Sequence, residues 1–124
     1  MTPTQRTLKA LRASGLNCWI VERWNPHVRI RQDAFGWIDI LAYSPAGIIG
    51  VQSTGQDFAG HRRKMLGERA EQVRGWLDAG GHAELWGWRK VKAKRGGKAM
   101  VWRPRVERFT METLDATENV RTSD

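Results

Sequence analysis

The spacing of apolar side chains along the chain predicts two amphipathic helices. Residues 4–14 carry a narrow apolar stripe at Leu8 and Leu11, and Gly15 is a natural stop for this helix. Residues 61–79 carry apolar side chains at intervals of four, three and four, which is the repeat of one helix face. We therefore expect a short N-terminal helix and one long central helix that two glycines end at residues 80–81.

Runs of β-branched and aromatic residues predict the strands. The expected strands are residues 17–24, 37–43, 48–54, 82–88 and 99–109, and residues 28–31 form a further short extended run. Residues 44–47 (SPAG) form a turn of the kind that joins antiparallel strands. Residues 90–98 are expected to form a flexible basic hairpin loop, and Pro104 marks the last strand as an edge strand.

The order of these elements is helix, three strands, helix and two strands. It predicts an α/β sandwich with a central mixed sheet flanked by helices, in which the long helix joins the antiparallel part of the sheet to the parallel part. Residues 1–110 form a single domain, and residues 111–124 form a polar tail that is either a short helix or disordered.

Seven tryptophans in 124 residues are too much apolar surface to leave in water, which argues against intrinsic disorder. We expect Trp19, Trp37 and Trp76 in the core between sheet and helix, and Phe35 packed beneath its own loop. Trp86 and Trp88 lie two residues apart and should share one strand face.

The charge of the chain points to a polyanionic partner. Lys and Arg number 21 against 13 Asp and Glu, a formal net charge of +8, and residues 85–106 contain no acid. Phosphate contacts dominate the affinity of basic surfaces for nucleic acids, and interleaved tryptophans can stack on bases. A solvated basic surface without a specific partner is the alternative. The expected nucleic-acid contacts are Arg62, Arg63, Arg89, Lys90, Lys92, Lys94, Arg95 and Lys98.

Several classes of protein are disfavoured. No window approaches 18 consecutive apolar residues, and the N-terminal segment lacks the apolar stretch of a signal peptide. Cys18 is the single cysteine and cannot form an internal disulfide, and the three histidines match no zinc spacing. We therefore expect a cytoplasmic, nucleic-acid-associated protein with no membrane partner.

The central hairpin brings candidate metal ligands together. If Tyr43 and Ile48 flank the turn as a pair, Asp39 lies directly opposite Gln52, and both side chains point to the same face. A carboxylate and an amide oxygen at this separation suit a hard cation such as Mg²⁺ or Mn²⁺. An ordinary strand acid that is hydrogen-bonded to Gln52 is the alternative.

Other polar groups are expected at the same end of this hairpin. The same register places Trp37 opposite Thr54, and Asp33 approaches from the preceding loop. An ionised Asp39 in a largely apolar strand costs free energy unless it is paired or bound to a metal. This cost favours a functional interpretation of the cluster.

At these residues the sequence resembles the PD-(D/E)xK nuclease superfamily, especially its small resolvase-like and phage-associated branches. The resemblance is carried by residues 32–39 (QDAFGWID) and 50–54 (GVQST), followed by residues 61–64 (HRRK) at a helix start. The resemblance covers about residues 4–90. It implies a restriction-endonuclease-like αβββαβ core and Mg²⁺- or Mn²⁺-dependent endonuclease cleavage of DNA, with branched or structured DNA as the expected substrate.

The resemblance also implies roles for individual residues. Asp39 takes the place of the metal-binding aspartate, Gln52 that of the second acid, and the backbone carbonyl of Ser53 would be a third ligand. Asp33 is a further candidate ligand. Glu22 is the nearest candidate for a glutamate that some branches carry on the first helix.

The chain departs from the family pattern at Thr54, where a lysine usually orients the attacking water. Thr54 can hydrogen-bond but carries no positive charge. Lys64 on the next helix is the candidate for a migrated lysine, and His61 is the second candidate.

Three functions therefore compete. The first is a metal-dependent DNA nuclease, and the second is a catalytically weak or inactive nucleic-acid-binding module of the same fold. The third is a small basic protein that docks an acidic partner protein. A homodimer is left open, because many resolvase-like enzymes dimerise.

Overall fold

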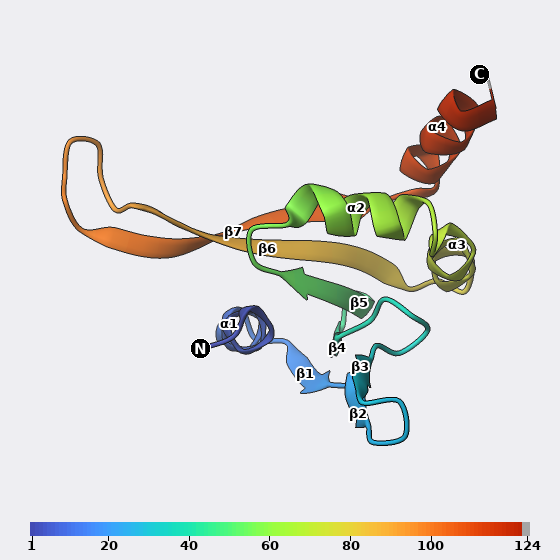
Figure 1. Cartoon of the computed structure of the whole chain (residues 1–124), viewed down its shortest axis with the longest axis horizontal. Helices are drawn as coiled ribbons and strands as arrows, with labels where there is room; N and C mark the ends of the chain where they lie inside the picture. Colours follow the sequence, from blue (N-terminus) through green and yellow to red (C-terminus); the bar gives the residue numbers. More distant parts are fainter. Residues whose placement is uncertain (123–124) are drawn as a thin grey trace.

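The computed structural model describes residues 1–122 and is built around a mixed sheet of five strands (Figure 1). In spatial order these strands are β1 (Asn17–Ile20), β4 (Ile40–Ser44), β5 (Gly47–Thr54), β6 (His82–Lys92) and β7 (Met100–Phe109). Neighbouring strands are antiparallel except β5 and β6, which are parallel. β2 (Arg23–Asn25) and β3 (Ile30–Gln32) form a separate pair. The helices are α1 (Pro3–Ala13), α2 (Phe58–Leu66), α3 (Ala70–Asp78) and α4 (Met111–Thr122). The predicted α/β class with a mixed sheet is confirmed.

Helix α1 covers one face of the sheet, as its apolar stripe predicts. The helix begins with a capping box in which Thr2 and Gln5 each accept a backbone hydrogen bond from the other. It ends at Ala13, and Gly15 then takes a φ of 86°. Leu11 packs with apolar side chains of β4 and β5, namely Ile40, Ala42, Ile49 and Val51.

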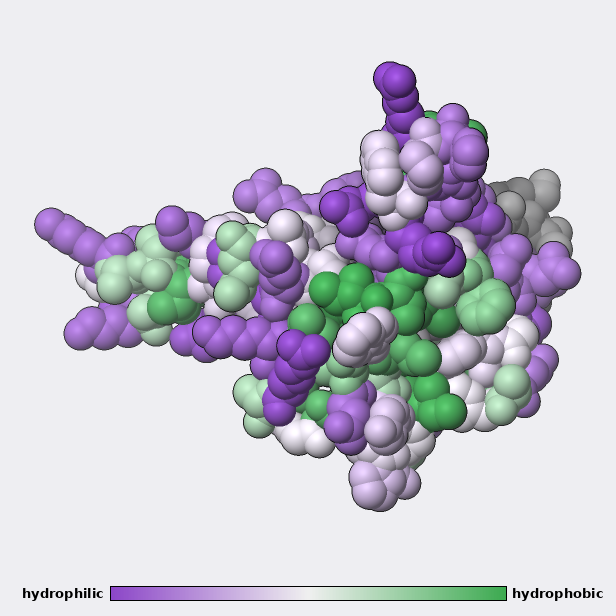
Figure 2. Space-filling model, turned by 90° about the horizontal axis from the view of Figure 1, so that it is seen from below, coloured by the Kyte–Doolittle hydropathy of each residue, from purple (hydrophilic) through white to green (hydrophobic). Residues whose placement is uncertain are grey.

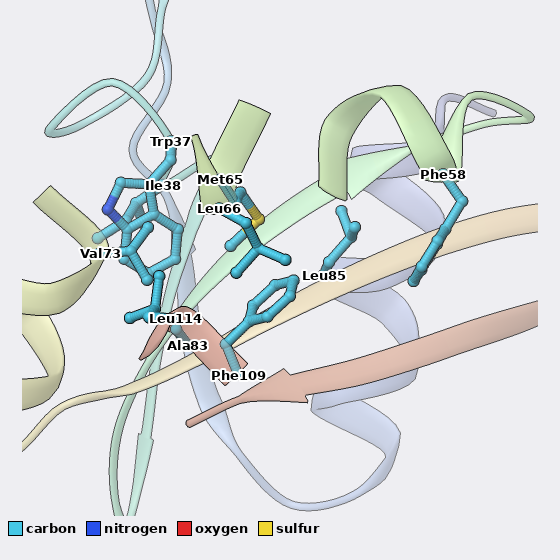
Figure 3. Packing of buried hydrophobic residues seen from close by; sticks show 10 residues of the cluster. All are labelled: Trp37, Ile38, Phe58, Met65, Leu66, Val73, Ala83, Leu85, Phe109 and Leu114. Atoms are coloured by element: carbon cyan, nitrogen blue, oxygen red, sulfur yellow. The ribbon is translucent and has the colours of Figure 1, made fainter. Parts of the chain in front are cut away.

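The other face carries the larger part of the core. Figure 3 shows Met65 and Leu66 of α2, Leu85 of β6 and Phe109 of β7 directed toward a common centre. Leu114 of α4 is 2% exposed and belongs to the same cluster. Residues 111–122 are therefore a helix that packs on the core, which confirms the helical alternative for this segment. Residues 123–124 lie outside the described residues.

The central helix is not one helix, as the sequence predicts, but two. It begins earlier, at Phe58, where the Asp57 side chain accepts a hydrogen bond from the backbone of Gly60. It breaks at Gly67, a residue that weakens helices, and α3 starts again at Ala70. The break allows α3 to turn away from α2, so that α3 is seen nearly end-on in Figure 1. The two helices still form the expected connection between parallel β5 and β6.

Two predicted strands also differ at their ends. The strand expected over residues 17–24 stops at Ile20, and the chain leaves the sheet to form β2 and β3 before it returns at Ile40. A tight turn then occupies residues 34–38, with φ values of 54° at Phe35 and 80° at Gly36. The expected register is confirmed from Tyr43 to Ile40.

Trp37 does not lie opposite Thr54, because the turn at residues 34–38 removes it from the strand. Its ring is buried and meets Trp76 edge to face, with ring centres 6.1 Å apart. The burial predicted for Trp19 and Phe35 is wrong, since their exposed fractions are 73% and 68%. Trp19 lies on the edge strand β1, on the face that α1 does not cover, and the positive φ of Phe35 turns its side chain outward.

Strand β6 extends to Lys92, four residues farther than the sequence predicts, whereas β7 differs from the predicted strand by one residue at its start. The first part of the expected loop at residues 90–98 is paired, because β6 continues to Lys92 opposite Met100 and the backbone of Ala93 donates to Ala99. β5 ends at Thr54, opposite Gly87, so that beyond this point β6 and β7 form a free two-stranded ribbon (Figure 1). β7 is an edge strand, as Pro104 predicts. No helix within residues 1–122 is long and apolar enough to cross a membrane.

Candidate metal centre

Three acids meet where the chain leaves and re-enters the sheet. Glu22 follows β1, Asp33 follows β3, and Asp39 precedes β4. One oxygen from each carboxyl group lies within 4.8 Å of the others. Ile20 pairs with Ile40, so the two ends of the segment 21–39 lie side by side. This pairing places the acids beside one another. Clusters of carboxylate oxygens of this kind suit hard divalent cations.

Asp39 is the most deeply placed of the three acids, at 3% exposure. Its Oδ2 accepts hydrogen bonds from the backbone nitrogen of Ser53 at 2.8 Å and from Nε2 of Gln52 at 2.7 Å. Nε2 of Gln52 also lies 3.3 Å from Oδ2 of Asp33. The Gln52 amide therefore bridges two carboxyl groups, and the predicted meeting of Asp39 and Gln52 across the hairpin is found.

Burial and the neighbouring acid make Asp39 hard to ionise. Desolvation is the main cause that raises the pKa of Asp39 to about 8, and a hydrogen bond and charge repulsion from Asp33 add to it. The hydrogen bonds from Ser53 and Gln52 lower this pKa by less. Without a cation, the Asp39 carboxyl group therefore keeps its proton near neutral pH. A divalent cation at this place would replace that proton.

Lys64 of α2 reaches the same cluster from above the sheet. Its Nζ lies 3.4 Å from Oε1 of Gln52 and 3.7 Å from Oδ2 of Asp33. The structure thus brings Lys64 to the place that the sequence suggests for a migrated lysine. Thr54 is buried and shares a strand face with Gln52, two residues away.

His61 lies one turn before Lys64 on α2 and is half-buried. Burial and the nearby Lys64 lower the pKa of His61, so that its ring is neutral at pH 7. Its Nδ1 is buried and has no hydrogen-bond partner among the described residues. The ring is therefore available as a hydrogen-bonding group beside the acids.

The cluster is open to solvent through Asp33. A cleft of about 460 Å³ lies against Asp33 and is lined by three cationic side chains, Arg31, Lys64 and Arg69. A second cleft, of about 530 Å³, lies against Asp33 on the side of β2. An anionic substrate can therefore approach the acids along a positively charged wall. Sequence reasoning missed Arg31 and Arg69, because Arg69 lies in the break after α2 that the apolar pattern does not reveal.

Two predicted ligands are arranged differently from the expectation. Gln52 turns its amide nitrogen to the carboxyl groups, so a role as a metal ligand requires a rotated amide that faces them with oxygen. Ser53 bonds Asp39 through its backbone nitrogen, and its hydroxyl bonds Thr7 on the α1 side. Glu22, Asp33 and Asp39 each bring one oxygen within 4.8 Å of the others, close enough to hold a cation once the Gln52 amide turns away. Glu22 is the acid that the sequence offers as the nearest alternative.

The basic residues after His61 do not act as one group. Arg62 forms an ion pair with Glu107 of β7, with Nε and Oε1 2.9 Å apart. Arg63 is exposed and lines a groove with Thr117 of α4. Helix geometry places only His61 and Lys64 toward the acids, because they are three residues apart. The expected contacts of Arg62 and Arg63 with nucleic acid stay predictions.

Comparisons with known proteins do not add to this geometry. No family model matches the chain, and neither the curated proteins nor the solved structures contain a match. The chemistry of the centre must therefore be argued from its own residues.

Proposed function

We propose that the chain is a Mg²⁺- or Mn²⁺-dependent nuclease of the PD-(D/E)xK type that hydrolyses phosphodiester bonds in DNA. The observation that carries this proposal is the convergence of three acids, one bridging amide and one lysine at the wall of an open cleft. The mixed sheet, with a helical connection between its parallel strands, is compatible with the αβββαβ core of that superfamily. Neither the argument from the site nor the argument from the fold depends on the net charge of the chain alone.

The donor set fits a hard cation. Glu22, Asp33 and Asp39 supply oxygen only, which is the chemistry that Mg²⁺ and Mn²⁺ prefer. Glu22 and Asp33 keep 18% and 17% of their side chains exposed, which leaves room for water molecules on a bound ion. A bound divalent ion would supply a hydroxide nucleophile and stabilise charge on the phosphate.

The residues of the chain orient the reactants. Gln52 holds the carboxyl groups of Asp33 and Asp39 in one arrangement through its amide nitrogen. Lys64 lies beside them and can donate a hydrogen bond to a phosphate oxygen or to the attacking water. Arg31 and Arg69 line the cleft through which a phosphodiester reaches Asp33. In the hydrolysis itself, the water oxygen bonds to phosphorus as the bond between phosphorus and the leaving sugar oxygen breaks. The attacking water loses one proton and the leaving oxygen takes one up, so the step is balanced.

A second function is a nucleic-acid-binding module that does not cleave. Thr54 and Gln52 favour it, because they stand where the superfamily has a lysine and an acid. Fewer charges at the centre weaken the hold on a cation. Nucleic acid is then bound by the same basic surfaces without hydrolysis.

A cleavage assay separates the two functions. Supercoiled plasmid and a synthetic four-way junction are incubated with the protein and Mg²⁺ or Mn²⁺, and a parallel sample contains EDTA. We expect cleavage with metal only, and its loss in Asp39→Asn. Asp78→Asn is the matched control, because Asp78 is an exposed aspartate at the end of α3. Cleavage that persists in Asp39→Asn contradicts the assigned site, and binding without any cleavage supports the second function.

A further inference from the structure

The free ribbon of β6 and β7 projects beyond the end of β5, the strand that carries Gln52 of the candidate centre. It comprises residues 88–104, which begin one residue beyond the position where β5 ends, and the pair of Gly87 and Arg105 forms its base. Figure 1 shows it as a long arm without a covering helix along its outer part, and Figure 2 shows hydrophilic side chains that project from its outer end. At about 3.3 Å per residue, the paired part from Trp88 to Ala93 extends about 17 Å, which equals the rise of about five base pairs along the axis of a DNA duplex.

The two faces of the ribbon differ in chemistry. Directly paired residues point to the same side, and Arg89 pairs with Arg103 while Gly87 pairs with Arg105. Arg89, Arg103 and Arg105 therefore form one face, which we call the arginine face. The opposite face carries Lys90 and Lys92, whose partners are Trp102 and Met100.

Helices contact the base of the ribbon on both faces, α2 on the arginine face and α1 on the opposite face. Arg6 of α1 lies 4.1 Å from the ring centre of Trp102, and Thr7 accepts a hydrogen bond from Nε1 of Trp88. On the arginine face, the guanidinium of Arg105 lies over the ring of Phe58, 4.1 Å from its centre, where α2 begins. The arginine face is thus on the α2 side of the sheet, the side from which Gln52 meets Lys64.

The charges of the arginine face are not compensated within the protein. None of Arg89, Arg103 and Arg105 forms an ion pair within the described part of the chain, whereas Arg62 and Arg108 of the body are paired with Glu107 and Glu84. Two like charges placed directly opposite each other on a ribbon destabilise it. An anion bound between Arg89 and Arg103 would remove that repulsion, and arginine matches phosphate oxygens in its geometry.

The position of the tryptophans distinguishes duplex from single-stranded nucleic acid. Proteins that bind single strands stack bases on exposed aromatic rings. On the ribbon, Trp88 is buried, whereas Trp102 is 41% exposed and has Arg6 over its ring; both are on the face opposite the arginines. The arginine face offers guanidinium groups without a stacking platform, which suits the regular phosphates of a duplex.

We propose that Arg89, Arg103 and Arg105 form a binding site for the phosphate backbone of double-stranded nucleic acid, beside the candidate metal centre. The identification of the bound polyanion as a nucleic acid rests on the proposed function. The site adds to that function a double-stranded substrate and the protein surface that binds it. The ribbon then aligns a duplex so that the cleft at Asp33 meets one of its phosphates.

Binding measurements without metal test this site separately from cleavage. The affinity of the full chain for a short fluorescent DNA duplex, and for one of its strands alone, is measured in EDTA at KCl concentrations from 50 to 200 mM. The test variant is Arg89→Gln with Arg103→Gln. The comparison variant is Lys90→Gln with Lys92→Gln, which removes the same charge from the other face of the same ribbon. The sequence predicts contacts with nucleic acid for these two lysines as well, so the two variants decide which face carries the phosphates. Circular dichroism and thermal melting check the fold of each variant.

We expect the duplex to bind more tightly than the single strand. The arginine variant should lower the slope of log affinity against log salt by about 2, since each phosphate contact contributes about 0.9. The rise in KCl then weakens the wild type about tenfold more than this variant, and the lysine variant keeps most of the wild-type slope. Arg89→Lys with Arg103→Lys, which keeps both charges, should restore most of the slope.

Three results would overturn the proposal. They are tighter binding of the single strand, an equal or larger slope change in the lysine variant, and no duplex binding at 50 mM KCl. Loss of cleavage with retained duplex binding contradicts only the proposed nuclease, and cleavage with an unchanged salt slope in the arginine variant contradicts only the ribbon site.

Discussion

The amide nitrogen of Gln52 donates to Oδ2 of Asp39 across 2.7 Å, and this bond joins the two sides of the central hairpin at the candidate metal centre. The same nitrogen lies 3.3 Å from Asp33, so one neutral amide stands between two carboxyl groups. A carboxylate in place of this amide would repel the carboxyl groups of Asp33 and Asp39 when no cation is bound. When a cation is bound, the added carboxylate would attract it.

Gln52→Glu should therefore lower the melting temperature in EDTA at pH 8 by several degrees and tighten the binding of Mn²⁺ about tenfold or more. Isothermal titration calorimetry and thermal melting with and without Mn²⁺ measure both effects. Gln56→Glu adds the same charge at an exposed position of the following loop and should change neither. Unchanged Mn²⁺ affinity in Gln52→Glu would show that the cation does not bind beside this residue.

The stability of the metal-free protein should depend on pH through Asp39. The folded-state pKa of Asp39 is about 8, above that of the unfolded chain, so the folded state holds a proton that the unfolded state releases. The free energy of unfolding therefore falls as pH rises from about 4 to about 8. Melting curves in EDTA over this range should show a smaller fall for Asp39→Asn than for the wild type.

Asp78→Asn, at an exposed position, should follow the wild type over the same pH range. Metal binding should show the opposite trend, since Mn²⁺ must displace the Asp39 proton and its affinity rises with pH up to about 8. A wild-type pH dependence that Asp39→Asn reproduces in full would contradict the assigned protonation.

Lys64→Ala should reduce the rate of cleavage about 100-fold, because removal of one positioned donor near a reacting phosphate has an effect of this size. Duplex affinity should change little, since one phosphate contact is a small part of the basic surface. Single-turnover cleavage and binding in EDTA measure the two quantities separately. Arg63→Ala is the neighbouring control, because Arg63 is exposed and faces α4. An equal loss in both variants would remove Lys64 from the proposed centre.

Thr7→Val should destabilise the fold by about 1–3 kcal/mol. The buried hydroxyl of Thr7 accepts hydrogen bonds from Trp88 at 2.8 Å and Ser53 at 3.1 Å, and it donates to the carbonyl of Pro3. Valine has the same shape but leaves the buried indole nitrogen and the Ser53 hydroxyl without this partner. Chemical denaturation measures the loss, and Thr4→Val, on the same helix, should cost less. Equal costs would show that the hydroxyl network contributes little.

Local patterns were sufficient for the parts of the centre that lie close in sequence. The four-residue turn and the alternation on both sides of it predict the register that pairs Tyr43 with Ile48, and this register brings Asp39 to Gln52. The sequence also predicts that Lys64 lies near Gln52. Lys64 belongs to the helix that follows β5, and that helix packs on the sheet face to which Gln52 points. These relations depend on a few neighbouring residues, and propensity and periodicity describe such residues well.

The errors have a common cause in contacts between distant segments. The apolar stripe of residues 61–79 continues across Gly67, but the helix breaks there and α3 packs through Trp76 against Trp37, a residue far away in the sequence. Trp19 has the composition of a core residue, yet its strand lies at the edge of the sheet, where no helix covers its outer face.

The sequence by itself determined the helix α1 and the central hairpin, since each follows from the local repeat of a helix or strand. Tertiary structure alone decided that Glu22 joins Asp33 and Asp39. It also decided that α1 contacts the base of the ribbon on the face opposite Arg89 and Arg103. The physical reason is that these outcomes depend on the pairing of distant strands and on the surface that each helix buries. No short stretch of residues encodes either of these.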